Sequence, residues 1–453
     1  MAKSTPFKIG IVGAGISSLA TAYFIEKYAS QKNIQVEIDI FEEASKAGGK
    51  IYSEQCGNFL VEHGADSIST RQAAVYELIS ELGLLSETIA PKERRFAILK
   101  DGKMQQVSLS LLAPFPKNLQ GLFSSKFVSF WGKLRACYGG ALVYLGIDRL
   151  FASKSDQSLQ AYFRKKWGKE VSEALLEPLF SGLYGGDLAK ISSRVLQLSS
   201  GKSKHNLPPY IGFKKGVFNL IETLRSNLKN SKIHFSEGVL GISKIENELL
   251  LKTAKGERRI QACIITTPAQ AAAKILLEAA PTVANLLANF QASDAAIVSL
   301  GFANYEANFD LLQTAGSGII IPVGESDKIR GITLSSRKWE NRSPQDQLLV
   351  RVFGREGVFE SLKKEEAIEL ARTELLRILN LQGNSIYSDL HVWKQGSALC
   401  SVGHREKITQ VKDELKVLPG TFLVGAPYGG VGIGDCIESA KNLAQALLRN
   451  ARV

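Results

Sequence analysis

The stretch Phe7-Lys8-Ile9-Gly10-Ile11-Val12-Gly13-Ala14-Gly15-Ile16-Ser17-Ser18 decides the fold of this chain. Its apolar run predicts a buried strand, and apolar residues at helical spacing follow from Ile16 onward. Gly13 allows a tight turn after the strand, and Gly15 lets backbone N–H groups approach a pyrophosphate at the positive end of the helix. The segment therefore predicts a strand, a turn and a helix that bind a dinucleotide.

The next segment predicts the second strand of a βαβ unit. Val36, Ile38 and Ile40 alternate with acidic residues and lead to Glu42. A carboxylate at this position can accept hydrogen bonds from a ribose diol, although Glu42 lies somewhat further along than is usual. Ser18 replaces the third glycine of the pattern, and it is small enough for the helix to pack on the strand.

A second glycine pair, Gly48-Gly49, comes just after this carboxylate and is followed by Lys50. A nicotinamide-binding fold does not need such a pair, whereas an extended FAD can pass over a flat glycine turn with Lys50 near its phosphates. A surface turn is the alternative interpretation. We expect one FAD per chain, held non-covalently, because neither Cys436 nor any histidine is assigned a covalent linkage.

The composition limits the class of protein. At 453 residues the chain exceeds one hydrophobic core, so two or three domains are expected. Its five cysteines and five histidines lack paired or metal-ligand spacing, which predicts a reducing cytoplasm and no metal. A net charge of +12 attracts polyanions, anionic lipid or acidic small molecules, and no motif supports nucleic acid. We expect neither a secretion signal nor a transmembrane segment.

The middle of the chain is helical in pattern. Residues 107–150 combine apolar and aromatic residues with interspersed lysines, which is typical either of buried helices in a second domain or of a face that rests on a membrane surface. Strands are expected again at residues 233–235, 239–245, 248–253 and 260–266, and a periodic helix at residues 365–380.

Three further motifs resemble those of the flavin-containing amine oxidase superfamily, and within that superfamily those of the porphyrinogen oxidases. They are VEHGADS at residues 61–67, SGLYGGD at residues 181–187 with Ser192 and Arg194, and GAPYGGVGIGDCIES at residues 425–439. The resemblance implies an α/β fold with a Rossmann-like FAD-binding domain built from discontinuous segments, a mixed α+β substrate domain and a helical insertion. The FAD-binding domain is assigned to residues 1–75, 205–275 and 412–453. The substrate domain is assigned to residues 76–106, 190–204 and 276–411, and the helical insertion to residues 107–189.

The resemblance also implies which residues bind the cofactor and the substrate. Arg95 matches a family arginine that meets a substrate propionate, although an exposed charged hairpin would look the same. Asp435 is expected to cap a helix with an inward apolar face. The cofactor contacts are expected at Gly13, Ala14, Gly15, Ile16, Ser17, Ser18, Glu42, Glu43, Lys50, Gly64, Ala65, Asp66, Ser67, Val239, Ala426, Val431, Gly432 and Ile433. The chain departs from the family pattern at residues 398–402, before Gly403-His404, and at Lys215-Gly216.

The expected reaction is the oxidation of coproporphyrinogen or protoporphyrinogen to the porphyrin in three two-electron steps. Dioxygen or another acceptor would reoxidise the FAD, and no dedicated base is required. A carotenoid desaturase or amine oxidase on the same fold is one alternative, and a non-catalytic binding protein is another. We expect a cytoplasmic protein, with the inner membrane surface as an optional docking partner and the oligomeric state left open.

Overall fold

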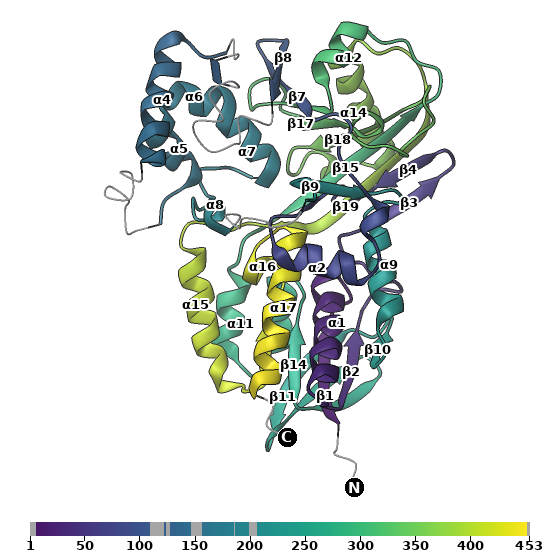
Figure 1. Ribbon diagram of the computed structural model, residues 1–453, viewed down its shortest axis with the longest axis vertical. Helices are drawn as coiled ribbons and strands as arrows, with labels where there is room; N and C mark the ends of the chain where they lie inside the picture. The colour runs from purple at the N-terminus through teal and green to yellow at the C-terminus, as the bar shows by residue number, and fades with distance from the viewer. Residues whose placement is uncertain are drawn as a thin grey trace.

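The computed structural model describes residues 6–108, 122–123, 127–145, 156–184, 186–198 and 206–450. Much of the stretch 107–150 therefore lies outside the described residues. Figure 1 shows two halves, with a sheet and long helices below, and a second sheet beside a group of helices above. The α/β fold class with an additional mixed domain and a helical part, expected from the sequence, is confirmed.

The lower sheet is parallel and has the order β10-β2-β1-β14-β20. Strand β1 (Phe7–Val12), helix α1 (Ile16–Gln31) and strand β2 (Val36–Phe41) form the βαβ unit predicted from the sequence. The other strands come from distant parts of the chain: β10 (Ser231–His234), β14 (Ala262–Ile265) and β20 (Thr421–Leu423). The first and the last described strand therefore belong to one sheet.

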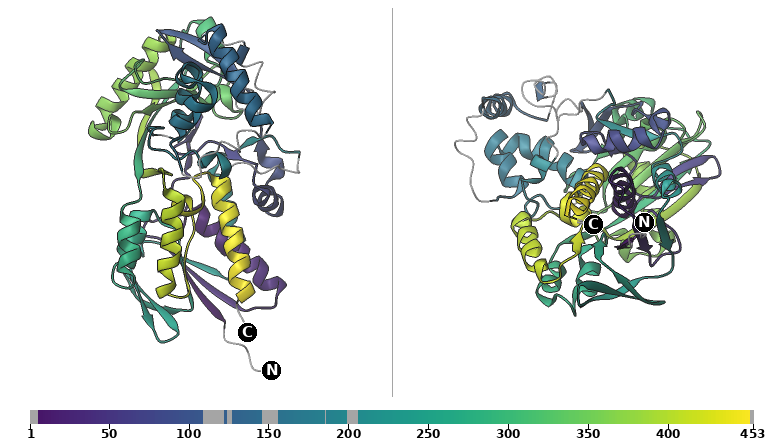
Figure 2. Two further views of the ribbon diagram at one scale, coloured as in Figure 1. Left: turned by 90° about the vertical axis from the view of Figure 1, so that its left-hand side faces the viewer. Right: turned by 60° about the horizontal axis from the view of Figure 1, so that its bottom comes forward.

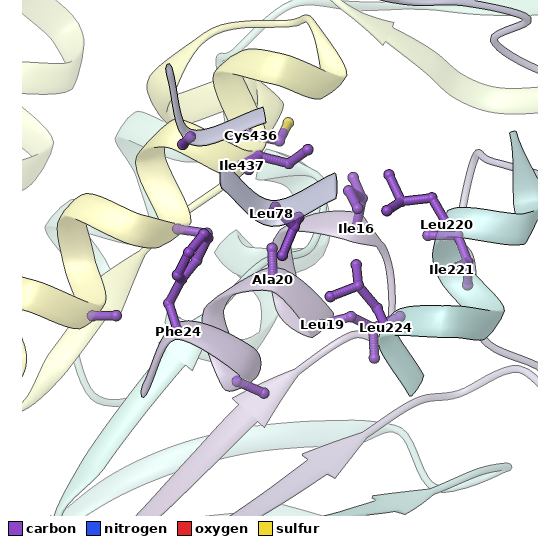
Figure 3. Packing of buried hydrophobic residues seen from close by; sticks show 14 of the residues in the cluster. Ile16, Leu19, Ala20, Phe24, Leu78, Leu220, Ile221, Leu224, Cys436 and Ile437 are labelled. Carbon is purple, nitrogen blue, oxygen red and sulfur yellow. The ribbon is translucent and has the colours of Figure 1, made fainter. Parts of the chain in front are cut away.

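Alternate residues of the central strands serve two separate cores, as the period of two in a strand requires. Ile9 and Ile11 of β1 face one core, whereas Val12 at the end of the strand joins the other. The first core contains α1, α17 (Ile433–Asn450), α9 (Phe218–Asn227) and α2 (Ala73–Glu81) (Figure 3). Phe24 of α1 is fully buried there, which stabilises the fold by about 1.5–3 kcal/mol.

The second core covers the opposite face of the parallel sheet (Figure 2). Its elements are the antiparallel strands β11 (Val239–Ile245), β12 (Glu248–Thr253) and β13 (Gly256–Ile260), with α10 (Ala269–Leu276), α11 (Pro281–Ala288), α15 (His404–Glu414) and η6 (Leu415–Val417). The strands expected at residues 233–235, 239–245, 248–253 and 260–266 correspond to β10, β11, β12 and β14.

The upper sheet has seven strands in the order β19-β15-β18-β17-β16-β7-β8. Helix α14 (Lys364–Leu379) packs on this sheet and confirms the periodic helix predicted at residues 365–380. Asn380 ends the helix, because its left-handed φ of 47° does not continue the helical turn. The strands are β19 (Ser385–Ala398), β15 (Ala292–Phe302), β18 (Leu348–Gly354), β17 (Ile329–Leu334), β16 (Gly318–Ile320), β7 (Arg95–Lys100) and β8 (Lys103–Ser108), with α12 (Phe309–Ala315), α13 (Ser335–Lys338) and η5 (Phe359–Ser361) between them.

Short elements join the two halves. They are the hairpin β3 (Ser53–Cys56) and β4 (Phe59–Glu62), and the strands β5 (Ile68–Ser69), β9 (Tyr210–Phe213) and β6 (Thr88–Ile89), with η1 (Leu85–Glu87). In this connecting layer Arg342 and Glu62 are both buried and lie 3.3 Å apart. Their mutual charge compensates for burial, because an isolated buried charge would be strongly unfavourable.

The helical part consists of α4 (Phe130–Tyr144), α5 (Leu159–Trp167), α6 (Lys169–Val171), the π-helical turn η4 (Ser172–Leu176), α7 (Glu177–Tyr184) and α8 (Val195–Leu198). Its core includes Phe163 and Leu175 and reaches Phe96 of β7 and Cys400 beyond β19. Among the described residues, no helix is both long and apolar enough to cross a membrane.

Candidate functional site

The turn between β1 and α1 is open on the side where an anion would bind. Gly13 has φ 96°, and a Cβ there would meet Thr266 Oγ1 at 3.0 Å. A Cβ on Gly15 would meet nothing within 4 Å, so space exists beside this residue. Gly15 precedes α1 without a side-chain cap. The N–H groups of the first helical turn are therefore available to an anion, which the helix dipole also favours.

Glu42 lies directly beside this turn, at the end of β2. One carboxylate oxygen accepts from Ala14 N at 2.7 Å, and the other accepts from Ala44 N at 2.9 Å. A carboxylate has about four acceptor positions, so about two remain for the hydroxyls of a ribose. The expected role of Glu42 is therefore compatible with its geometry.

The second glycine pair packs against the first turn. Gly48 N donates to Ala14 O at 2.9 Å, and Gly48 forms an isolated parallel bridge with Gly15. A Cβ on Gly49 would lie 3.5 Å from the Gly15 Cα, so side chains here would narrow the gap between the two turns. Two glycine turns that are 33 residues apart in sequence thus form one cradle.

The start of β11 completes this end of the cradle. Glu237 N donates to Glu42 O at 2.8 Å, and a Cβ on Gly238 would lie 3.3 Å from Glu43 Cβ. Val239 therefore begins its strand beside Glu42 and Glu43. The structure thus brings these three predicted residues together.

Residues 64–67 follow β4 and are held by buried charges. Asp66 accepts two bonds of 2.9 Å from Lys338 Nζ and lies 2.7 Å from Arg351 Nη2. Burial alone would raise the pKa of Asp66, but Lys338 and Arg351 hold it well below its usual range. Because the Asp66 carboxylate is bound by Lys338 and Arg351, it holds residues 64–67 in place. Gly64, the exposed Ala65 and Ser67 then offer mainly backbone to a cofactor.

The C-terminal motif reaches the same cradle from the other side. Helix α16 (Ala426–Gly429) is short, and a Cβ on Gly425 would lie 3.2 Å from Ser17 Oγ. The capping prediction required Asp435 to lie just before its helix. Helix α17 begins at Ile433, so Asp435 lies inside the first turn instead. Its carboxylate accepts from Gly432 N at 3.1 Å and thereby fixes the loop that precedes the helix.

The inward face expected for this helix is confirmed. It contains Ile437, Ala440, Ala444 and Leu447, all of them buried. Cys436 is buried as well, and burial raises the pKa of its thiol to about 11, as suits a packing residue.

Lys50 directly follows the second glycine turn, and its side chain reaches the other half of the molecule. Its ammonium group donates to Gln395 O of β19, and burial lowers its pKa. It lines a small cavity together with Ala398, His404 and Pro427. Lys50 therefore lies at the junction of the two halves, and Cys436 in α17 is close enough to affect its pKa. Its expected place near the phosphates stays a prediction.

A second, apolar cavity shares Ala398 with the first. It is lined by Tyr184, Ile191, Val195, Ala398, Leu399, Cys400 and Val431. Of these, only Val431 was assigned a role from the sequence. The sequence did mark residues 181–187 and 398–402 as motif positions, which was a signal for this cavity, but it did not show that they meet.

Arg95 is found at the start of β7 with an exposed side chain. Its guanidinium binds Glu93 through two bonds of 3.0 and 2.7 Å. The next residue, Phe96, belongs to the apolar cluster that includes Cys400 and Val431. Glu93 uses two of the five guanidinium N–H donors, so the others remain open to a substrate carboxylate.

The residues present fit a flavin dinucleotide. Two buried hydroxyls near the cradle, Ser18 Oγ and Thr267 Oγ1, have no hydrogen-bond partner in the part of the chain that the structure describes. With the open space at Gly15 and the two turns in contact, they are suited to a long polar ligand that runs from Val239 towards Lys50. The fold and this cradle define a dinucleotide-binding flavoprotein with a separate substrate-side sheet.

The chain belongs to the flavin containing amine oxidoreductase family, whose model matches residues 19–448. It is 27% identical to coproporphyrinogen III oxidase of Bacillus subtilis over 95% of this chain and 96% of that protein. It is 26% identical to the chloroplastic protoporphyrinogen oxidase 1 of Arabidopsis thaliana over 96% of this chain and 86% of that protein. FAD is the cofactor of this chain, as expected from the sequence.

Solved structures agree on the fold. A putative protoporphyrinogen oxidase from Exiguobacterium sp. 255-15 has a TM-score of 0.82 at 24% identity, with 98% of this chain and 99% of that chain covered. Reduced UDP-galactopyranose mutase has a TM-score of 0.73 at 14% identity, with 99% and 97% covered. At these identities, the likeness concerns the fold alone.

Proposed function

We propose that the chain oxidises a porphyrinogen, either coproporphyrinogen or protoporphyrinogen, to the corresponding porphyrin. The observation that carries this is the apolar cavity between α7 and the end of β19, which shares Ala398 with the cavity beside Lys50. A porphyrinogen is larger than this cavity, so the cavity would contact one edge of the macrocycle and place that edge next to the redox group. The named activities of the Bacillus subtilis and Arabidopsis thaliana relatives support this substrate class.

The side chains around the apolar cavity orient a substrate and exclude water. Tyr184, Leu399 and Val431 provide apolar surface, and burial raises the pKa of Tyr184 to about 12, so it stays protonated at neutral pH. We infer no dedicated base at this cavity, because pyrrole N–H protons can leave to water. FAD, when bound, supplies the hydride acceptor.

Lys50 would place a positive charge beside the cofactor ring. It is largely buried and touches Gln395 O, so its charge is poorly screened by solvent. When Lys50 is protonated, its charge would favour electron density on a neighbouring ring system. Each two-electron step would remove a hydride and a proton from the substrate, and three such steps would pass six electrons to dioxygen or another acceptor.

The substrate assay should use anaerobically prepared coproporphyrinogen and protoporphyrinogen, offered separately, with porphyrin fluorescence followed after oxygen is admitted. Formation of either porphyrin at a rate above the protein-free control supports the proposal, and the faster substrate identifies the class. No enzyme-dependent porphyrin from either substrate would refute it. Acid precipitation should release the flavin into the supernatant, as non-covalent binding requires.

The cavity itself can be tested with Leu399→Trp. The larger ring would fill the apolar cavity, so we expect turnover to fall at least tenfold with an unchanged flavin content. Leu240→Trp is the matched control, because Leu240 is 60% exposed on β11. Wild-type kinetics in Leu399→Trp would remove this cavity from the substrate site.

Peripheral membrane association is a further part of the proposal. Helix α4 exposes three apolar side chains at helical spacing, Trp131, Leu134 and Tyr138, with exposed fractions of 74%, 51% and 62%. Lys133 and Arg135 lie between them, and the chain carries a net charge of +12. Such a face suits the inner, anionic surface of a membrane.

Co-sedimentation with vesicles tests this association. The wild type should bind vesicles that contain phosphatidylserine at low salt and should dissociate at high salt. Trp131→Asp combined with Leu134→Asp should abolish binding, whereas Leu277→Asp, at an exposed apolar position next to α10, should not. Equal binding by all three proteins would exclude α4 as the docking face.

A further inference from the structure

A cluster of potential metal ligands lies in the layer that connects the two halves, outside the two cavities. Glu54 and Cys56 are two residues apart on β3, so both side chains point to one face of the hairpin. His63 follows β4 and pairs with the start of the hairpin, since His63 N donates to Tyr52 O at 2.9 Å. In an antiparallel pair, opposite residues share a face, which brings the imidazole beside Glu54 and Cys56.

The ligand atoms of Glu54, Cys56 and His63 all lie within 4.8 Å of one another. Ligands of a tetrahedral zinc ion are separated by about 3.3–3.8 Å, given bonds of about 2.0–2.3 Å. Glu54 is 48% exposed and can rotate, so a modest side-chain adjustment would close the set. One imidazole, one thiolate and one carboxylate suit a borderline ion such as Zn²⁺.

The imidazole of His63 offers a buried nitrogen that could bind a metal ion. Its side chain is only 3% exposed, and its Nε2 has no hydrogen-bond partner in the part of the chain that the structure describes. Glu54 Oε2 lies 3.3 Å away, and this long contact with a half-exposed carboxylate is its nearest polar interaction. A buried nitrogen without a partner is unfavourable, and an ion bound there would satisfy it.

Asp389 lies on the Nδ1 side of the His63 imidazole, opposite the nitrogen that would bind the ion. Asp389 Oδ2 lies 3.8 Å from His63 Nδ1, and its other oxygen accepts from Lys364 Nζ at 2.6 Å. Histidines that bind metals commonly present their second nitrogen to a carboxylate in this way. Tyr387 contributes a hydrogen bond to the Cys56 thiol from the same strand, β19.

We propose that Glu54, Cys56 and His63 bind one Zn²⁺ ion, with water as the fourth ligand. Binding would release the thiol proton of Cys56 to solvent and would displace water from the ion. The ion would join β3 to the residue that follows β4, directly before the segment 64–67. It would therefore stabilise the hairpin that leads into the proposed cofactor site.

Zinc stoichiometry provides the first test. The FAD-loaded protein should be freed of metal with EDTA, dialysed against a low zinc concentration and analysed for bound zinc by mass spectrometry. We expect one zinc per chain in the wild type, and at least tenfold weaker binding in Cys56→Ser and in His63→Gln. Cys137→Ser is the matched control, because Cys137 is also partly exposed but lies outside the cluster. It should bind zinc like the wild type.

Thiol alkylation provides a second measurement that does not depend on the folding of the variants. Zinc should slow alkylation of Cys56 in the wild type at least tenfold, as read by peptide mapping, and should leave Cys137 unchanged. The proposal is overturned if the wild type retains no zinc, or if Cys56→Ser binds it normally. It is also overturned if His391→Gln abolishes binding while Cys56→Ser does not, because His63, Asp389 and His391 form the alternative ligand set.

Discussion

Replacing Glu42 by alanine should weaken FAD binding by about ten- to a hundredfold. The carboxylate uses two acceptor positions on Ala14 N and Ala44 N, at 2.7 and 2.9 Å, and about two remain for ribose hydroxyls. One charge-assisted hydrogen bond contributes about 1.5–3 kcal/mol, and each 1.4 kcal/mol corresponds to about a factor of ten. Loss of one ribose bond therefore predicts this range.

The assay is reconstitution of flavin-free protein with FAD, followed by flavin fluorescence quenching. Because Glu42 also holds two backbone N–H groups, the melting temperature of the flavin-free variant must be measured beside it. Glu42→Gln keeps one carbonyl oxygen and should show an intermediate affinity. Glu37→Gln, at an exposed position of β2, is the control and should bind FAD like the wild type.

The outcome separates two roles. If Glu42→Ala melts at a lower temperature but binds FAD with unchanged affinity, Glu42 only supports the glycine turn, and the reasoning about the ribose is refuted. If affinity falls without a comparable loss of stability, the direct contact is supported.

Three other predictions follow from the charges and the burial of particular residues. The pKa of Asp66 is lower in the folded than in the unfolded protein, so ionised Asp66 adds to the free energy of unfolding above its unfolded pKa of about 4. This contribution is lost as the pH falls from there towards the lower folded pKa. Denaturant titrations should show stability falling more steeply from pH 5 to 3 in the wild type than in Asp66→Asn, and parallel curves would contradict this. The Cys400 and Cys436 thiols, with pKa values of about 11, should not react with a thiol reagent at pH 8 until the protein is unfolded; rapid labelling of both in the folded state would contradict their burial. Arg95→Ala should raise KM for the porphyrinogen about tenfold with a smaller change in kcat, and Arg95→Lys should recover part of the loss, because a lysine lacks the forked geometry. Wild-type KM in both variants would make Arg95 an ordinary surface residue.

The sequence was sufficient for features that depend on local chemistry. The apolar run before Gly13 and the helical spacing after Ile16 predicted β1 and α1, because strand and helix periods are set by neighbouring residues. The inward face of α17 and the end of α14 at residue 380 were accessible for the same reason. Just before the motif at residues 425–439, β20 joins the same sheet as β1.

The tertiary structure decided how distant side chains meet. The long side chain of Lys50 reaches Gln395, 345 residues away, because the two halves meet there. The partners of Asp66 come from residues 338–351, and the apolar cavity joins residues of α7, β19 and the loop before α17. The cluster around His63 has the same origin, since its carboxylate support lies on β19. Local periodicity carries no information about such encounters, because they depend on how packed sheets and helices orient one another.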